Sequence, residues 1–261
     1  MDMQNGVAIV TGASSGVGAA CAEKLAELGC HVVINYSRNE EGALTTESGC
    51  KELGVETRVV QADVGNPSDC QKLADAALDA WGRIDALINN AGTTKFNPHQ
   101  NLEGLTKEDF LDIYSVNTVG PYMMTRAVVP AMQRGQRGSI VNVSSIAGVM
   151  GVGSSVAYAA SKGALNTMTL SLARVLGPHI RVNTICPGFI QGEWLRQGLG
   201  DESYEASLER VRATTPLQVA STPEQIADGV LYFITGADVV TGETLILDGG
   251  AHLATAGLSK R

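Results

Sequence analysis

Tyr158 and Lys162 are the two residues whose types and spacing most directly suggest chemistry, because they stand four positions apart in a stretch that reads as helical. On a helix, that spacing places both side chains on one face. A phenol has a pKa of about 10 in water, and a neighbouring ammonium group favours the phenolate and lowers that value. The pair therefore predicts a group that protonates a carbonyl oxygen or deprotonates an alcohol. Alone, the same spacing is also typical of an ordinary pair on a helix surface.

Ser145 is a third candidate for this site, since it precedes Tyr158 by thirteen positions (158 − 145 = 13) and follows an apolar run at 139–143. The run is typical of a buried strand, and a hydroxyl at its end could hydrogen-bond the same substrate oxygen. Adjacent side chains on a strand point to opposite faces, so only one of Ser144 and Ser145 should face the substrate. The thirteen-residue spacing favours Ser145.

A glycine-rich turn near the N-terminus supplies a second pattern, between a predicted strand at 6–11 and a predicted helix at 19–28. It reads Gly12-Ala13-Ser14-Ser15-Gly16-Val17-Gly18. Glycines leave room for a pyrophosphate to approach backbone N–H groups at a helix N-terminus. The spacing is Gly-x-x-x-Gly-x-Gly rather than the Gly-x-Gly-x-x-Gly of most dinucleotide-binding folds. A tight turn without a ligand is the alternative.

The same turn also fits Gly-x-Ser-x-Gly, the nucleophile elbow of serine hydrolases, with Ser14 as the nucleophile. An elbow needs earlier strands and an oxyanion loop, but only one predicted strand precedes Ser14. The four histidines have no evident catalytic setting in the sequence (His31, His99, His179 and His252). The hydrolase interpretation is therefore the weaker one.

Predicted strands and helices alternate along almost the whole chain. The strands are expected at 6–11, 31–35, 56–61, 86–89, 139–143, 180–185 and 244–247. The helices are expected at 19–28, 40–53, 68–81, 106–132 and 156–176 and from 222, with caps at Ser68, Thr106 (with Asp109) and Thr222 (with Gln225). The strands are apolar throughout, which indicates a parallel sheet covered on both faces. We expect one α/β domain, a Rossmann-type doubly wound sheet over 1–261, with an unpatterned stretch at 189–217 and a loose tail at 254–261.

Ligands of such sheets bind beyond the carboxyl ends of the strands. Five polar or glycine-rich segments each follow a predicted strand and should gather along that edge: Gly12–Gly18, Asp63, Asn89–Gly92, Ser145 and Pro187-Gly188.

Composition excludes several classes of function. The net charge of −8 and the lack of a basic run argue against a nucleic-acid partner. The five scattered cysteines form no Cys-x-x-Cys pair, which disfavours a metal site and indicates reduced thiols in a cytoplasmic protein. No signal peptide or membrane-spanning stretch is apparent, so no membrane partner is expected.

Taken together, these motifs resemble those of the short-chain dehydrogenase/reductase family over about 6–253. The matching positions are the cofactor loop (Thr11, Gly12, Gly16, Gly18), the adenine contact (Asp63, Val64), the sheet motif (Asn89, Asn90, Ala91, Gly92), the catalytic tetrad (Asn117, Ser145, Tyr158, Lys162) and the turn beside the nicotinamide (Pro187, Gly188). Within the family, the chain most resembles 3-oxoacyl-acyl-carrier-protein reductases and related carbonyl reductases.

The resemblance implies a role for each residue of the tetrad. Tyr158 would be the acid in ketone reduction and the base in alcohol oxidation, while Lys162 would lower its pKa and hold the cofactor ribose. Ser145 would polarise the carbonyl, and Asn117 would support a water chain that returns protons through Lys162. The implied cofactor contacts are Gly12, Ser14, Ser15, Gly16, Val17, Gly18, Asp63, Val64, Asn90, Ala91, Gly92, Tyr158, Lys162, Pro187, Gly188 and Ile190. Asp63 could instead cap a turn at a strand end.

The segment after Pro187-Gly188 departs from the family pattern, because Gly192 stands where a threonine often reaches the nicotinamide amide. Trp194, Leu195 and Leu199 follow in the unpatterned stretch. They could form a substrate lid or pack against the body of the protein.

The end of the second strand predicts a preference for NADP(H), with NAD(H) also possible. NAD enzymes place an acidic residue about 20 positions after the glycine loop, whereas an arginine accommodates the 2′-phosphate of NADP. Here Ser37 and Arg38 follow the strand, and no carboxylate occupies the expected place. Both side chains could bind a phosphate, although Arg38 could also be a plain surface residue.

The sequence therefore predicts an NADP(H)-dependent reductase of a 3-oxoacyl thioester or another carbonyl compound. An NAD-dependent alcohol or sugar dehydrogenase of the same family is the alternative, and a non-catalytic dinucleotide sensor or a serine hydrolase is more remote. The resemblance also implies a homotetramer, with an acyl carrier protein or a coenzyme A thioester as a further partner.

Overall fold

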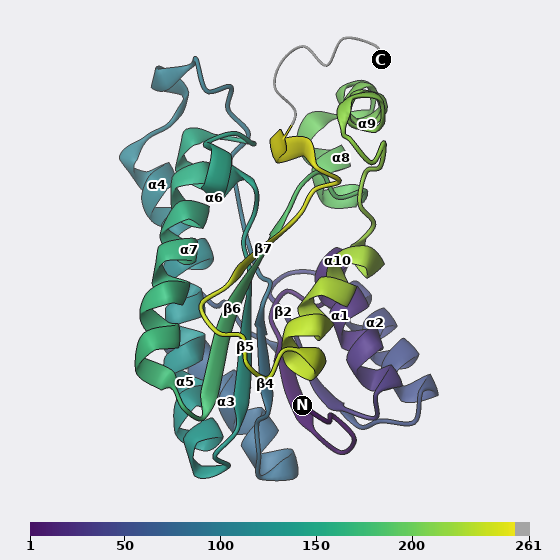
Figure 1. The fold of residues 1–261 in the computed structure, drawn as a ribbon, viewed down its shortest axis with the longest axis vertical. Helices are drawn as coiled ribbons and strands as arrows, with labels where there is room; N and C mark the ends of the chain where they lie inside the picture. The colour runs from purple at the N-terminus through teal and green to yellow at the C-terminus, as the bar shows by residue number, and fades with distance from the viewer. Residues whose placement is uncertain (254–261) are drawn as a thin grey trace.

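The computed structural model describes residues 1–253 and contains a seven-stranded sheet with helices on both faces (Figure 1). The strands are β1 (Val7–Val10), β2 (His31–Tyr36), β3 (Thr57–Gln61), β4 (Ala86–Asn89), β5 (Gly138–Val143), β6 (Ile180–Pro187) and β7 (Thr244–Leu247). Every neighbouring pair is parallel, in the order β3-β2-β1-β4-β5-β6-β7. The doubly wound Rossmann-type sheet predicted from the sequence is confirmed.

The helices form two layers around this sheet. They are α1 (Gly16–Glu27), α2 (Glu40–Glu52), α3 (Pro67–Trp81), α4 (Lys107–Tyr114), α5 (Gly120–Arg134), α6 (Ala147–Met150), α7 (Val156–Leu176), α8 (Glu193–Leu199), α9 (Asp201–Thr214) and α10 (Pro223–Leu231), with short turns η1 (Leu102–Gly104), η2 (Ser115–Val119), η3 (Tyr232–Gly236) and η4 (Ala251–Leu253). Helices α1, α2 and α10 cover one face, and α3, α5 and α7 cover the other (Figure 1). Two apolar clusters result, one under each layer.

Burial explains why the central strands are apolar throughout. Every residue of β1, β4 and β5 is buried, because helices cover both sides of the sheet. A parallel sheet needs this double cover, since its crossover helices necessarily lie on its faces.

Local signals place two helix starts correctly and one incorrectly. Thr106 with Asp109 and Thr222 with Gln225 both form reciprocal capping boxes, as predicted. The predicted cap at Ser68 is wrong: Asn66 caps α3 by accepting a hydrogen bond from the Ser68 N–H at 3.1 Å. Pro67 occupies the first turn and so moves the cap one residue before it.

Two stretches differ from the sequence-based expectation. The helix expected over 106–132 is interrupted by the π-helical turn η2. The unpatterned stretch at 189–217 contains α8 and α9, which form an apolar cluster of their own around Tyr204 and Leu208. The tail at 254–261 lies outside the described residues.

The five cysteines are free and buried, as expected. Within residues 1–253, the helices are too short or too polar to cross a bilayer.

Candidate active site

The predicted site residues meet where the parallel strands end. The glycine loop follows β1, Asn90 follows β4, Ser145 follows β5, and Gly188 follows β6. Gly188 donates its N–H to Leu247 O at 2.9 Å, which joins the last two strand ends. This is the edge at which doubly wound sheets bind ligands.

Helix α7 carries Tyr158 and Lys162 toward the end of β5. Ser155 caps the helix by accepting a hydrogen bond from the Tyr158 N–H at 3.2 Å, so Tyr158 lies in the first turn. Lys162 is only 4% exposed, and its Nζ donates to Val143 O at 2.8 Å. The same Nζ lies 5.8 Å from the centre of the Tyr158 ring. The four-residue spacing thus brings the phenol and the amine together, as the helical periodicity requires.

Burial dominates the protonation of both groups. It raises the pKa of Tyr158 to about 12, although a hydrogen bond from Ser145 partly opposes the rise. It also lowers the pKa of Lys162 to about 8. Lys162 is not among the causes of the Tyr158 pKa shift, so burial, which disfavours the charged form of each group, outweighs the lowering expected from this neighbour. Tyr158 therefore holds its proton at neutral pH, whereas Lys162 loses its proton at about pH 8, just above neutral pH.

The two serines after β5 point in different directions. Ser144 is 4% exposed and donates its hydroxyl to Lys162 O at 3.1 Å, so it braces the backbone of α7. The Ser145 hydroxyl accepts a hydrogen bond from the Ala147 N–H at 3.1 Å and remains beside Tyr158. Ser145 is thus the serine whose hydroxyl lies beside the Tyr158 phenol.

Asn117 lies in the π turn η2, where its side chain is held at three points. Its Oδ1 accepts from the Thr93 N–H at 2.8 Å, and its Nδ2 donates to Thr93 O at 2.9 Å and to Ser161 Oγ at 3.0 Å. A Cβ placed on Gly92 would lie 3.4 Å from Asn117 Oδ1 and 3.6 Å from Lys162 Nζ, so Asn117 and Lys162 both border Gly92. Single π turns within helical regions are frequently found at functional sites.

The glycine loop is shaped by close backbone packing. Gly12 has φ +62°, and a Cβ on Gly18 would overlap Gly12 O, so neither position accepts a larger residue without a shift of the loop. Asn90 fixes the loop to the end of β4 by donating to Thr11 O at 3.0 Å and to Gly12 O at 2.9 Å. The Ala91 N–H adds a bond to Thr11 Oγ1 at 3.1 Å. Asn90 and Ala91 therefore hold the glycine loop against the end of β4.

The start of α1 fits a dinucleotide pyrophosphate. Ser15 is the N-cap but makes no side-chain cap hydrogen bond, and the first turn holds no acidic residue. A Cβ on Gly16 would meet nothing within 4 Å, so the approach to Ser14, Ser15 and the first N–H groups is open. Val17 is buried under the loop. These free N–H groups and the positive end of the helix dipole favour an anion.

The remaining predicted cofactor residues lie around this loop. Asp63 caps its own turn by accepting from the Gly65 N–H at 2.9 Å, and Val64 beside it is buried. The backbone of Phe189 and Gln191 pairs with Ser221, which turns the peptide groups of Ile190 between them to the opposite side. The Pro187-Gly188 turn packs against Asp248.

Ser37 and Arg38 follow β2 and are both exposed. Arg38 makes no ion pair with any residue in 1–253. Glu40, the nearest downstream carboxylate, accepts a hydrogen bond from Tyr36 Oη at 3.1 Å. Arg38 is therefore available to an anionic ligand.

Two residues that position the site were not predicted from the sequence, Asn35 and Ser161. Asn35 accepts from the Gly12 N–H at 3.0 Å through Oδ1 and so holds the glycine loop against β2. Ser161 bridges Asn117 and the Tyr158 carbonyl oxygen, to which it donates at 2.7 Å. Asn35 could have been predicted as a site residue because it is a polar residue in an otherwise apolar strand. Ser161 could have been predicted because it stands three positions after Tyr158, on the same face of the helix.

The histidines lie apart from Ser14 within the described residues. His31 stacks on Trp81 at 5.4 Å between ring centres, and His252 pairs with Asp248 at 2.9 Å. His99 lines a cavity beside α6 and α7, and His179 accepts a backbone bond from Gly138. The arrangement thus gives no support to the nucleophile elbow.

Comparison with known proteins agrees with this geometry. Residues 12–252 match a family model described as enoyl-(acyl carrier protein) reductase. A Streptomyces violaceoruber protein, assigned as ketoacyl reductase 2 of the granaticin polyketide synthase, is 40% identical over 95% of this chain and 96% of its own length. The 3-oxoacyl-acyl-carrier-protein reductase of Vibrio cholerae is 35% identical over 97% of this chain and 100% of its own length. A solved Burkholderia xenovorans structure, titled as a short-chain dehydrogenase/reductase, superposes with a TM-score of 0.89 at 40% identity and covers 96% of this chain and 99% of its own.

The chain therefore belongs to the short-chain dehydrogenase/reductase family of oxidoreductases. Membership implies a nicotinamide dinucleotide cofactor, and the open N-terminus of α1 fits its pyrophosphate.

Proposed function

We propose that this protein is an NADP(H)-dependent oxidoreductase that reversibly reduces a ketone, either a 3-oxoacyl thioester or another carbonyl compound, to a secondary alcohol. The observation that carries the proposal is the convergence of Ser145, Tyr158 and Lys162 at the carboxyl edge of the sheet, beside a glycine loop open to an anion. We further propose that residues 1–261 act as one domain.

Side chains of the protein supply the proton that this reaction consumes. The cofactor, when bound, supplies the hydride. Tyr158 carries its proton at neutral pH because its pKa is about 12, so it can donate that proton to the ketone oxygen. Ser145 hydrogen-bonds the same oxygen and polarises the carbonyl. Lys162, with a pKa near 8, replaces the Tyr158 proton, and Asn117 beside Gly92 orders the route to solvent.

We propose the following cofactor contacts. The N-terminus of α1 with Gly12, Ser14, Ser15, Gly16, Val17 and Gly18 holds the pyrophosphate, Asp63 and Val64 border the adenine, and Asn90, Ala91, Gly92, Pro187, Gly188, Ile190, Tyr158 and Lys162 border the nicotinamide ribose and ring. Ser37 and Arg38 would take the 2′-phosphate that distinguishes NADP from NAD.

Arg38→Ala is expected to raise the Michaelis constant for NADPH about tenfold, since a charge-assisted bond to phosphate contributes about 1.5–3 kcal/mol when buried and less at an exposed site. The constant for NADH should not change. Initial rates with each cofactor for wild type and variant measure this. A wild-type enzyme that uses NADH more efficiently than NADPH would contradict the proposal and favour an NAD-dependent alcohol or sugar dehydrogenase.

Ketone reduction is expected to slow as pH rises through about 8, because Lys162 is charged below its pKa and loses its proton above it. Alcohol oxidation releases a proton and should instead gain rate toward alkaline pH. The kcat profiles for both directions, recorded under conditions where chemistry limits the rate, measure this. Identical profiles would count against tyrosine-mediated transfer.

A panel of 3-oxoacyl thioesters, simple ketones and sugars, followed by NADPH absorbance, tests the proposed function itself. At least one ketone should be reduced. Cofactor binding without turnover on any of them would favour the dinucleotide sensor.

The partners that we propose are a small carbonyl substrate, carried as an acyl-carrier-protein or coenzyme A thioester in the 3-oxoacyl case, and further copies of the chain in a homotetramer. The buried free cysteines support a reducing compartment, the cytoplasm.

A further inference from the structure

A row of three aromatic rings leads away from the catalytic tyrosine. The Trp194 ring lies 6.2 Å from the Tyr158 ring at 42°, and 5.9 Å from the Phe96 ring at 51°. Phe96 belongs to the segment after β4, and Trp194 belongs to α8, beyond β6. Both segments follow carboxyl ends of strands, so the row lies on the side where ligands bind.

Trp194 exposes a large apolar surface next to the reaction centre. It is 49% exposed, and α8 has no fully buried residue. Leu195 and Leu199 of the same helix pack instead into the cluster around Tyr204 and Leu208. The helix was expected either to cover the substrate or to pack against the body of the protein. Its leucines pack within the protein, whereas Trp194 faces the site.

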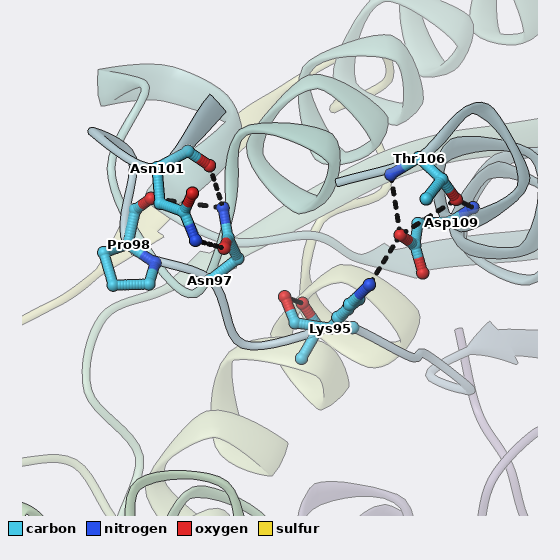
Figure 2. A network of polar contacts seen from close by, with 7 residues as sticks. Lys95, Asn97, Pro98, Asn101, Thr106 and Asp109 are labelled. Carbon is cyan, nitrogen blue, oxygen red and sulfur yellow. Dashed lines mark hydrogen bonds and ion pairs between the residues drawn. The ribbon is translucent and has the colours of Figure 1, made fainter. Parts of the chain in front are cut away.

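The residues before and after Phe96 in the sequence make polar contacts with neighbouring segments (Figure 2). Before it, Lys95 Nζ pairs with Asp109 Oδ2 at 2.7 Å. After it, Asn97 and Asn101 hydrogen-bond each other, with Asn97 Nδ2 donating to Asn101 O at 2.8 Å. The Asn97 N–H also donates to Ser154 O at 2.8 Å, which joins this segment to the residues before Tyr158. The segment that carries Phe96 is thus tied to α4 and to the residues before α7.

Trp194 is carried by a segment that packs largely within itself. The α8–α9 cluster is separate from the two clusters of the sheet. Gly192 and Gly200 flank α8 with φ of 153° and 78°, and a Cβ on either would meet nothing within 4 Å. Gly198 permits α8 to lie against Phe96, since a Cβ at Gly198 would overlap the Phe96 ring.

We propose that Phe96 and Trp194 form a subsite that selects carbonyl substrates bearing a planar aromatic group. This inference rests on the proposed ketone reduction and names its substrate class. Aromatic rings prefer stacked or edge-to-face partners with centres about 4.5–7 Å apart, and such contacts add roughly two- to tenfold in affinity beyond the area they bury. A saturated ring of the same size lacks the flat face and the quadrupole that this preference needs.

The test compares 4-phenylbutan-2-one with 4-cyclohexylbutan-2-one, whose carbonyl groups are chemically alike because two methylenes separate each from its ring. Trp194→Leu should lower kcat/KM about tenfold for the phenyl ketone and much less for the cyclohexyl ketone. Trp194→Phe should retain most of the phenyl preference, and Phe96→Leu should reduce it. An equal loss with both ketones in Trp194→Leu would overturn the inference.

A binding measurement separates this inference from the proposed function. The chain has two tryptophans, and Trp81 lies elsewhere, in contact with His31 and Arg58, so Trp81→Phe leaves Trp194 as the sole tryptophan, which can be excited selectively over the tyrosines. Adding 4-phenylbutan-2-ol should change the Trp194 emission at a concentration about tenfold lower than 4-cyclohexylbutan-2-ol requires. Equal half-saturation for the two alcohols would overturn the subsite. Selective binding without reduction of either ketone would support the subsite and contradict the proposed function.

Discussion

Tyr158→Phe is expected to lower kcat/KM for ketone reduction by about 10²–10⁴-fold, the usual contribution of a general acid. The substitution keeps the ring against Trp194 and removes only the hydroxyl whose proton would reach the substrate oxygen. NADPH binding should be retained, because the pyrophosphate contacts that we propose at the N-terminus of α1 do not involve the Tyr158 hydroxyl. Steady-state kinetics and a fluorescence titration with NADPH measure the two effects.

Tyr232→Phe is the matched control, since it removes a phenol that is 50% exposed and lies in η3. Surface substitutions of this kind change free energies by less than about 0.5 kcal/mol, so its kinetics should stay close to wild type. A loss of less than about tenfold in Tyr158→Phe would remove Tyr158 from the role of proton donor.

Lys162→Met should produce the second large effect, a fall in kcat/KM of about a hundredfold or more, because the proton that replenishes Tyr158 is lost. The variant also leaves the Val143 carbonyl without the donor that now lies at 2.8 Å. An unpaired buried carbonyl costs about 1–3 kcal/mol, so the free energy of unfolding should fall by that amount. Kinetics and urea unfolding measure both quantities.

Lys51→Met provides the comparison for this variant, because Lys51 is a mostly exposed lysine paired with Glu47 on α2. It should unfold and turn over like wild type. If Lys162→Met lost stability but kept its activity, Lys162 would be a structural residue, and the proposal that it replaces the Tyr158 proton would be wrong.

Helices that begin with a capping box and strands that consist of an apolar run could be predicted from the sequence. The capping box of Thr222 and Gln225 and the apolar strand β4 are specified by neighbouring residues. The α3 cap was misplaced because Asn66 and Ser68 are both good capping residues, and only the position of Pro67 between them decides. The π turn η2 could not be predicted, since a turn of five residues is too short to establish a period of its own between two helices.

The candidate site was predictable in outline, because parallel strands bring their carboxyl ends together and so assemble residues that are distant in sequence. Its electrostatics were not predictable. Spacing places Lys162 beside Tyr158, but the pKa of each depends on how deeply the finished fold encloses it. Helices α8 and α9 were missed because neither has a long apolar face: α8 has no buried residue, and α9 buries only Tyr204 and Leu208, in a small separate cluster.

Identification of the reaction products tests directly whether this protein reduces ketones, because it distinguishes reduction of a C=O bond from reduction of a C=C bond. The enzyme would be incubated with NADPH and, in separate reactions, a 3-oxoacyl thioester, a simple ketone and a 2-enoyl thioester, with products identified by mass spectrometry. We expect a secondary alcohol from at least one ketone, one molecule for each NADPH oxidised, and no saturated product from the enoyl thioester. A saturated thioester from the enoyl substrate, with both ketones unchanged, would contradict the proposed ketone reduction.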